Sequence, residues 1–218
     1  MINVDPIELQ KFSELAHRWW DPHSEFKPLH DINPLRLGYI DRVAGLKGKR
    51  VLDVGCGGGR TVSKLAAMAA QGKVYGVDYS DESVAATKRT NARWIELGRV
   101  EIRHGSVSEL PFPDGMFDLV TAVETHFWWP NLPGDMREVF RVTKPGGMLA
   151  LIAEVYKGAN TMAAKLAEKY ASRTGMTLLS VDEHRELFTN AGYSDVQAVE
   201  ERGKGWICAT GRKPIAHA

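Results

Sequence analysis

The stretch Val51-Leu52-Asp53-Val54-Gly55-Cys56-Gly57-Gly58-Gly59 decides the fold and holds four of the 21 glycines of this 218-residue chain. Its first four residues predict a buried strand, and residues 59–70 have the apolar spacing of a helix. Glycines between a strand and a helix let a ligand approach the backbone closely, at the edge where open α/β sheets bind ligands. A tight turn alone would need only one or two of them. The stretch therefore predicts a ligand-binding loop beside a parallel sheet.

Strands and helices alternate on the C-terminal side of this loop. Strands are predicted at residues 50–54, 73–77, 100–104, 117–123 and 148–155, and helices at residues 59–70, 80–97, 134–142, 160–173 and 181–191. Such alternation indicates a parallel sheet covered by helices on both faces. Residues 195–200 and 206–211 form two last strands, whose short link permits only a hairpin. The expected fold class is α/β, with a doubly wound, mostly parallel, seven-stranded sheet and a C-terminal antiparallel hairpin strand.

The N-terminal residues have a different character from the alternating part. A first helix is predicted after Asp5-Pro6 and a second over residues 33–44, with prolines between them. We therefore expect an N-terminal helical cap at residues 1–47, a ligand-binding domain at residues 48–213 and a tail at residues 214–218.

Composition narrows the class of partner and the compartment. The 28 Lys+Arg and 27 Asp+Glu residues give a net charge of +1, which argues against a nucleic-acid partner. The longest apolar run, residues 148–153, is far shorter than the roughly 18 residues of a spanning helix, so no stable membrane insertion is expected. The first 25 residues lack a secretory signal, and Cys56 and Cys208 lack zinc-site spacing. These features predict a cytoplasmic protein that acts on a small molecule, and they leave its oligomeric state open.

A nicotinamide-binding loop is a testable alternative for the glycine-rich stretch. The dinucleotide fingerprint Gly-x-Gly-x-x-Gly would require glycine at position 60 or 62, but Arg60 and Val62 stand there. Instead, Asp53 stands two residues before Gly55, and glycines follow at every second position, Gly55, Gly57 and Gly59. A carboxylate at that position suits a cationic ligand group better than a pyrophosphate. The pattern disfavours a nicotinamide oxidoreductase.

A second carboxylate follows the next predicted strand. Asp78 lies 19 residues beyond Gly59, where an acidic side chain can accept hydrogen bonds from both hydroxyls of a ribose. A helix-capping role is the alternative, although Ser80 or Asp81 already supplies a cap. We therefore assign Asp78 to a ribose-binding position and include the adjacent Tyr79 in the same site.

The glycine loop, Asp78, residues 105–118 and residues 143–147 together resemble the class I S-adenosylmethionine-dependent methyltransferases. This resemblance implies S-adenosylmethionine as cofactor and S-adenosylhomocysteine as product. The residues it implies for cofactor binding are Asp53, Gly55, Cys56, Gly57, Gly59, Asp78, Tyr79, Ser106, Val107, Val123 and Glu124. The family often has Gly-Asp-Ala where this chain has Gly105-Ser106-Val107, so only a hydroxyl and a backbone N–H are offered to adenine.

Residues 12–21 and 25–40 more narrowly resemble the ubiquinone-biosynthesis O-methyltransferase family. This resemblance implies that Arg36 binds the carboxylate of the cofactor's methionyl group, with a surface arginine as the alternative. From about Arg60 onward the resemblance weakens, because Glu124-Thr-His126-Phe-Trp-Trp-Pro replaces the family's Glu-x-x-Glu-His. The two halves indicate different relatives, so the family's polyprenyl-catechol substrate is not transferred to this chain.

Methyl transfer from a sulfonium is an in-line displacement that depends mainly on alignment, with a base needed only when the acceptor loses a proton. His126 is the candidate base, and a structural histidine paired with a carboxylate is an equal alternative. Trp19, Trp20 and the aromatic run at residues 127–129 are candidate walls of an acceptor pocket or ordinary core. No metal-ligand set is evident. We predict O-methylation of a small molecule, with a cofactor-binding protein lacking transferase activity as the alternative.

Overall fold

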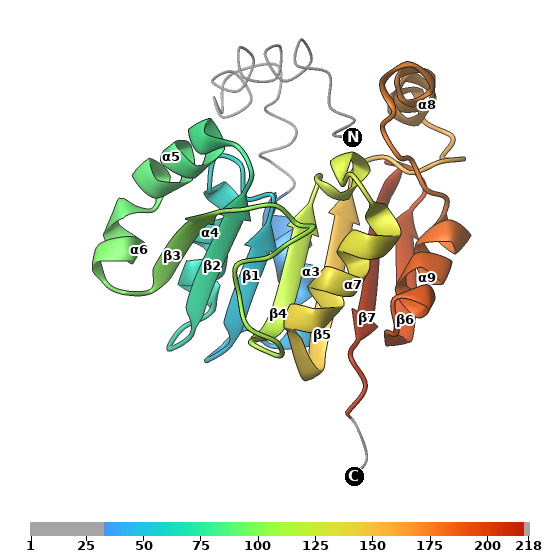
Figure 1. The fold of residues 1–218 in the computed structure, drawn as a ribbon. Helices are drawn as coiled ribbons and strands as arrows, with labels where there is room; N and C mark the ends of the chain where they lie inside the picture. Colours follow the sequence, from blue (N-terminus) through green and yellow to red (C-terminus); the bar gives the residue numbers. More distant parts are fainter. Residues whose placement is uncertain (1–32, 216–218) are drawn as a thin grey trace.

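One seven-stranded sheet with the order β3-β2-β1-β4-β5-β7-β6 organises residues 33–215, the part of the chain that the computed structural model describes (Figure 1). The strands are β1 (Arg50–Val54), β2 (Lys73–Asp78), β3 (Val100–His104), β4 (Phe117–Val123), β5 (Thr143–Ala153), β6 (Ser194–Glu201) and β7 (Trp206–Arg212). The helices are α3 (Asn33–Ala44), α4 (Arg60–Met68), α5 (Asp81–Thr90), α6 (Ala92–Glu96), the 3₁₀ turn η1 (His126–Trp128), α7 (Leu132–Val142), α8 (Met162–Thr174) and α9 (Val181–Asn190).

The strand pairing confirms the predicted topology. Strand β1 pairs in parallel with both β2 and β4, so the strand order reverses at β1 and leaves a ligand-binding position at its carboxyl end. Strand β7 is antiparallel to both of its neighbours, β5 and β6. It is therefore the single antiparallel strand that the short hairpin link predicts. In Figure 1 the arrowheads of the parallel strands meet at the upper edge of the sheet.

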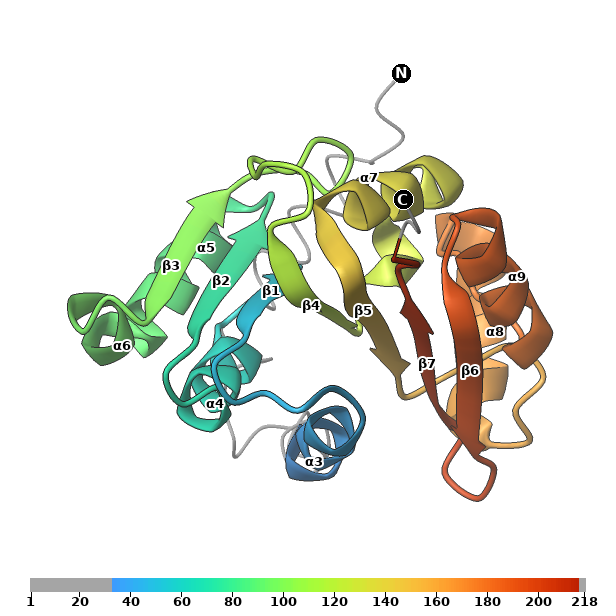
Figure 2. The ribbon, with the colours of Figure 1, turned by 90° about the horizontal axis from the view of Figure 1, so that it is seen from below.

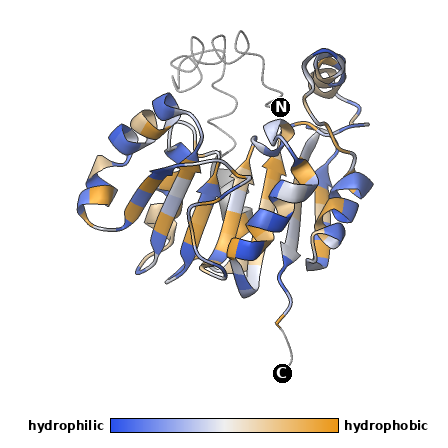
Figure 3. Cartoon of the chain, in the orientation of Figure 1, coloured by the Kyte–Doolittle hydropathy of each residue, from blue (hydrophilic) through white to orange (hydrophobic). Residues whose placement is uncertain are grey.

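Helices cover both faces of the sheet, as Figure 2 shows from below. On one face the core joins the strands to α7 and α9 through Met136, Val139 and Phe188, and on the other it joins them to α3, α4 and α5 through Ile40, Leu65 and Val84. The adjacent residues Val51 and Leu52 enter opposite cores because successive strand side chains alternate in direction. Apolar residues accordingly concentrate along the strands in Figure 3.

The prediction of a single helix over residues 80–97 is wrong. The structure divides this segment at Asn91 into α5 and α6. The side-chain amide of this fully buried residue donates to the carbonyl oxygens of Gly59 and Thr87 at 2.9 and 3.0 Å. The cap predicted at Ser80 is confirmed by the bond from the Ser83 N–H to its hydroxyl. The break therefore follows from a tertiary contact with the glycine loop.

Two other boundaries differ from the sequence prediction. Helix α7 begins at Leu132, two residues before the predicted start, because the side chain of Asn131 caps it. Strand β5 begins at Thr143, because Thr143 pairs with Phe117 before a register shift. The capping box predicted for α9 is present, with Ser180 and Glu183 exchanging both hydrogen bonds.

The predicted cap at residues 1–47 lies largely outside the described residues, as do Trp19 and Trp20. Helix α3 is as predicted, and Ile40 and Leu46 pack into the core beside α4. Arg36 lies in this helix, but its side chain is outside the described part. Among the helices of residues 33–215, none combines the length and apolar character needed to cross a bilayer.

Candidate functional site

The glycine loop after β1 requires glycine for steric reasons at two positions. Gly55 and Gly59 have φ angles of 71° and 80°, which L side chains rarely adopt. A Cβ at Gly55 would lie 2.5 Å from Cγ2 of Thr125, and a Cβ at Gly59 would lie 2.8 Å from the backbone Cα of Thr87. The loop is thus packed directly against the segment after β4 and against α5.

Hydrogen bonds fasten the same loop to β2 and α5. The N–H groups of Gly55 and Cys56 donate to the Val77 carbonyl at 2.8 and 3.1 Å. The hydroxyl of Thr87 donates to the Gly57 carbonyl, and Asn91 holds the Gly59 carbonyl. Loop, strand and helix therefore form one fixed unit at the carboxyl edge of the sheet.

Asp78 lies at the end of β2, directly against this loop. Its two carboxylate oxygens accept the N–H groups of Gly57 at 2.9 Å and Ser80 at 3.0 Å. Burial raises its pKa, although these backbone bonds oppose the shift. A carboxylate has about four acceptor positions, so both oxygens can still accept a ligand hydroxyl. The adjacent Tyr79 is 58% exposed.

Asp53 lies at the centre of the sheet, paired in register with Thr121 of β4. The Thr121 hydroxyl donates to its carboxyl group at 2.6 Å. Burial, together with the charge of Asp78, raises the pKa of Asp53 to about 7 despite that hydrogen bond. A cationic ligand group would stabilise the ionised form of this buried carboxyl, which agrees with the preference inferred from its position before the glycines.

The segment after β4 completes this part of the edge. Glu124 has a φ of 59°, an unusual conformation for a residue other than glycine, and its N–H donates to the Ile152 carbonyl at 2.9 Å. The Thr125 hydroxyl donates to the Val54 carbonyl at 3.1 Å. The chain turn at Glu124, next to the half-buried Val123, thus brings Thr125 against the glycine loop. Strained backbone of this kind is concentrated at ligand sites.

Ser106 and Val107 follow β3 at the same edge. Ser106 is exposed, and its hydroxyl oxygen accepts the Ser108 N–H at 3.1 Å, which leaves the hydroxyl hydrogen available to a ligand. The Val107 side chain is buried in the core. The hydroxyl of Ser108 in turn donates to Asp135 of α7 at 2.7 Å. The start of this loop is therefore fixed to a helix on the same face.

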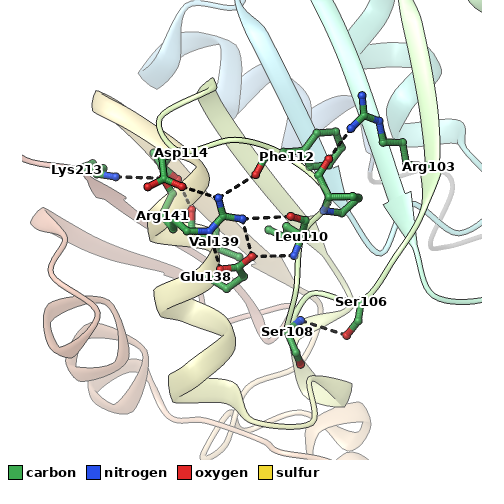
Figure 4. A network of polar contacts seen from close by, with 12 residues as sticks. Arg103, Ser106, Ser108, Leu110, Phe112, Asp114, Glu138, Val139, Arg141 and Lys213 are labelled. Carbon is green, nitrogen blue, oxygen red and sulfur yellow. Dashed lines mark hydrogen bonds and ion pairs between the residues drawn. The ribbon is translucent and has the colours of Figure 1, made fainter.

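The remainder of the loop is clamped by one arginine (Figure 4). Arg141 of α7 donates to the carbonyls of Leu110 and Phe112 and to the carboxylate of Asp114, at 3.1, 2.8 and 2.7 Å. Glu138 accepts the Leu110 N–H at 2.8 Å and also pairs with Arg141 at 2.7 Å. This network holds the loop in one conformation without a regular element.

His126 lies in η1 and is completely buried. Its neighbour is not the carboxylate that the sequence suggests but His184 of α9, with an Nε2–Nε2 distance of 3.3 Å. Burial, together with the neighbouring His184, lowers the pKa of His126 to about 3. Sequence reasoning missed His184, because no local pattern connects residues 58 positions apart.

The aromatic run after β4 divides between core and surface. Phe127 and Trp129 are buried, whereas Trp128 is 37% exposed and lies edge-on to Tyr170 of α8. Of the candidate wall residues that the structure describes, Trp128 is thus the one with substantial exposure. No cluster of three or more potential metal ligands occurs within residues 33–215.

Comparison with known proteins agrees with this geometry. Residues 52–151 match a family model described as a methyltransferase domain. A ubiquinone biosynthesis O-methyltransferase of Aromatoleum aromaticum is 47% identical over 150 residues, 68% of this chain and 62% of that protein. The chain therefore spans about three fifths of that relative's length. A match this long continues well past Arg60, so the similarity is not confined to the N-terminal quarter.

Solved structures establish the same fold. The putative methyltransferase bound to the Trm112 activator of Haloferax volcanii aligns with a TM-score of 0.76 at 20% identity, covering 94% of this chain and 98% of that one. A geranyl diphosphate methyltransferase in complex with S-adenosylmethionine aligns with a TM-score of 0.70 at 14% identity, covering 90% and 94%. In sequence over its central part and in fold over most of its length, this chain is thus similar to S-adenosylmethionine-dependent methyltransferases.

Proposed function

We propose that the protein transfers the methyl group of S-adenosylmethionine to a hydroxyl group of a small molecule. The observation that carries this proposal is the packing of the glycine loop against two buried carboxylates, Asp53 and Asp78, where the strand order reverses. The free acceptor capacity of Asp78 suits a ribose, and the buried, partly neutral Asp53 suits a cationic amino group.

The remaining cofactor contacts follow from the same edge. Gly55, Cys56, Gly57 and Gly59 would accommodate the methionyl end, with Val123 and Glu124 beside it. Tyr79, Ser106 and Val107 would contact the adenosine, and Arg36 would bind the methionyl carboxylate. When bound, the cofactor supplies an electrophilic methyl group on a positively charged sulfur.

His126 is the residue proposed to receive the acceptor's proton. At neutral pH its imidazole is uncharged, because burial keeps its pKa near 3. A neutral imidazole accepts a hydrogen bond from a hydroxyl and takes the proton as the new ether bond forms. A protonated ether is a far stronger acid than this imidazolium, so even a weak base is sufficient. The acceptor proposed is a phenolic hydroxyl, because the partly exposed ring of Trp128 suits a flat acceptor. The proposed location is the cytoplasm.

Calorimetric titration with S-adenosylhomocysteine tests the cofactor site. Asp78→Ala should weaken binding by about 100-fold or more, since two hydrogen bonds to a charged group are lost. The matched control is Asp81→Ala, an exposed acidic residue three positions on, which should change the affinity less than about twofold. Equal affinities of Asp78→Ala and the unmodified protein would show that the ribose lies elsewhere.

Methyl transfer itself requires a separate assay. Transfer of tritium from methyl-labelled cofactor to catechol, caffeate or 4-nitrophenol should be detected in the unmodified protein and lost in Asp78→Ala. Cofactor binding without transfer to any hydroxyl, amine or thiol acceptor would favour the cofactor-binding alternative over an enzyme.

A further inference from the structure

His126 and His184 form a buried pair that joins the segment after β4 to helix α9. Their Nε2 atoms are 3.3 Å apart, and both rings are buried. The Nδ1 atom of His184 lies 2.7 Å from the Ser180 carbonyl, one turn earlier in the capping box of α9. These two contacts determine where the protons of both rings lie.

A carbonyl oxygen only accepts hydrogen bonds, so Nδ1 of His184 carries a hydrogen. Burial lowers the pKa of His184, so the ring is neutral and its Nε2 is a bare acceptor. The contact between the rings then requires a hydrogen on Nε2 of His126, which leaves Nδ1 of His126 as a bare lone pair. Nε2–H of His126 thus donates to Nε2 of His184, and Nδ1–H of His184 donates to the Ser180 carbonyl.

The Nδ1 atom of His126 is buried and has no hydrogen-bond partner among the residues that the structure describes. Leaving a buried polar atom unsatisfied costs about 1–3 kcal/mol, and most such atoms in native proteins have a partner. An apolar side chain of similar size at position 126 would avoid that cost. The orphan acceptor therefore needs a ligand or a functional explanation.

The chain neighbours of His126 pack against the glycine loop on one side and against the segment before α9 on the other. His126 stands two residues after Glu124, the strained position at the end of β4, and directly after Thr125, which packs against Gly55. The other side of η1 is fixed by the Thr177 N–H, which donates to the Phe127 carbonyl at 2.9 Å. His126 thus lies between the glycine loop and the segment that leads into α9.

We propose that His184 is a positioning residue that holds His126 as its Nε2–H tautomer, so that Nδ1 of His126 accepts the proton of the hydroxyl being methylated. This inference rests on the proposed function. The hydroxyl oxygen bonds to the methyl carbon, the carbon–sulfur electron pair goes to sulfur, and the hydroxyl proton passes to Nδ1. The positive charge moves from the sulfur to the imidazole pair, so the buried site holds the same net charge before and after transfer.

Nitrogen-15 NMR on histidine-labelled protein tests the tautomers without any activity. Long-range proton–nitrogen correlations at pH 7 should show His184 with hydrogen on Nδ1 and His126 with hydrogen on Nε2, assigned by the loss of signals in His126→Asn and His184→Asn. A charged His126 or its Nδ1–H form at pH 7 would overturn the proposal, whatever the enzyme does.

Two variants of His184 separate positioning from packing. Glutamine places its amide oxygen near the position of Nε2 and can still accept from His126, whereas asparagine reaches only the position of Nδ1. We expect His184→Gln to retain kcat within about threefold and His184→Asn to lose about tenfold or more, with the KM for the cofactor unchanged in both. Long-range NMR of His184→Asn should then show His126 shifting toward the other tautomer.

The outcomes distinguish this inference from the proposed function. Equal losses of kcat in the asparagine and glutamine variants, with unchanged cofactor affinity, would overturn the positioning role and leave the transferase proposal intact. Absence of methyl transfer by the unmodified protein would overturn both, even if the NMR tautomers were as expected. Melting temperatures of both variants show whether either loss reflects unfolding.

Discussion

The two ends of the carboxyl edge are built by different means. On the side of β1, β2 and β3, the glycine loop is held by backbone geometry and by hydrogen bonds to Thr87 and Asn91. On the side of η1, α8 and α9, a buried histidine keeps an unpartnered atom within the described residues, and α8 exposes Leu166 and Tyr170. We call the first part the rigid side, because a Cβ at Gly55 or Gly59 would meet a neighbouring atom at 2.5 Å. We call the second part the acceptor side, because it contains the base proposed for the methyl acceptor.

The largest effect is expected from a methyl group added to the rigid side. Gly59→Ala places a Cβ 2.8 Å from the Thr87 backbone at a φ of 80°. Strain and overpacking together should lower the free energy of unfolding by about 3–4 kcal/mol, or about 10 °C in melting temperature. Gly158→Ala is the matched control, because its φ is 86° but no atom lies within 4 Å of its Cβ position. Similar losses in both variants would mean that strain alone, and not packing, matters at the loop.

The next largest effect concerns the charge at the centre of the rigid side. The folded-state pKa of Asp53 is about 7, above its unfolded value, so the folded state binds the proton more tightly. This group's contribution to stability is present at low pH and is lost as pH rises toward 7. The loss amounts to about 2.5 kcal/mol between pH 5 and pH 8.

Asp53→Asn should remove this dependence while keeping the bond from Thr121. Chemical denaturation at pH 5 and pH 8 should therefore give closer stabilities than in the unmodified protein, with the variant more stable at pH 8. Its affinity for S-adenosylhomocysteine should fall by about tenfold, since a neutral amide attracts an ammonium less strongly than a carboxylate does. Unchanged affinity would show that Asp53 serves the fold alone.

A smaller effect is expected where the loop after β3 meets α7. Arg141→Met removes the contacts to Leu110, Phe112 and Asp114, which should cost about 1–2 kcal/mol of stability and raise hydrogen exchange in residues 105–116. The control Arg185→Met breaks an exposed pair with Asp182 and should cost less than about 0.5 kcal/mol. Protection of residues 105–116 unchanged by Arg141→Met would mean that the loop is rigid without its clamp.

The smallest effect is expected on the acceptor side. Leu166 of α8 is 60% exposed, so Leu166→Gln should change the free energy of unfolding by less than about 0.5 kcal/mol. Ala164→Leu, two residues earlier on the buried face, should cost about 1–3 kcal/mol by overpacking. A loss above about 1 kcal/mol in Leu166→Gln would show that this face is covered, and the contrast between the two sides would fail.

Sequence patterns predicted the rigid side more completely than the other. The strands at residues 50–54, 100–104 and 117–123 have the predicted bounds, because buried apolar runs end there at polar or glycine residues. The glycine loop, Asp53 and Asp78 come together as expected, since the carboxyl ends of neighbouring parallel strands share one edge.

What sequence reasoning missed depends on contacts between distant residues. The break at Asn91 exists because its amide reaches Gly59, and the partner of His126 comes from α9. Periodicity and local spacing carry no information about such pairs. The loop after β3 is similar: its anchor at Arg141 is 31 residues from Leu110, and no repeat or motif connects them.

The position of β7 has a consequence for synthesis of the chain. β6 precedes β7 along the chain, yet β6 reaches β5 only through β7. Until residues 206–212 leave the ribosome, the free edges of β5 and β6 both lack a partner, and unpaired edges favour association with other chains. Nascent chains that stall before Trp206 should therefore depend on chaperones more than those that stall after Arg212.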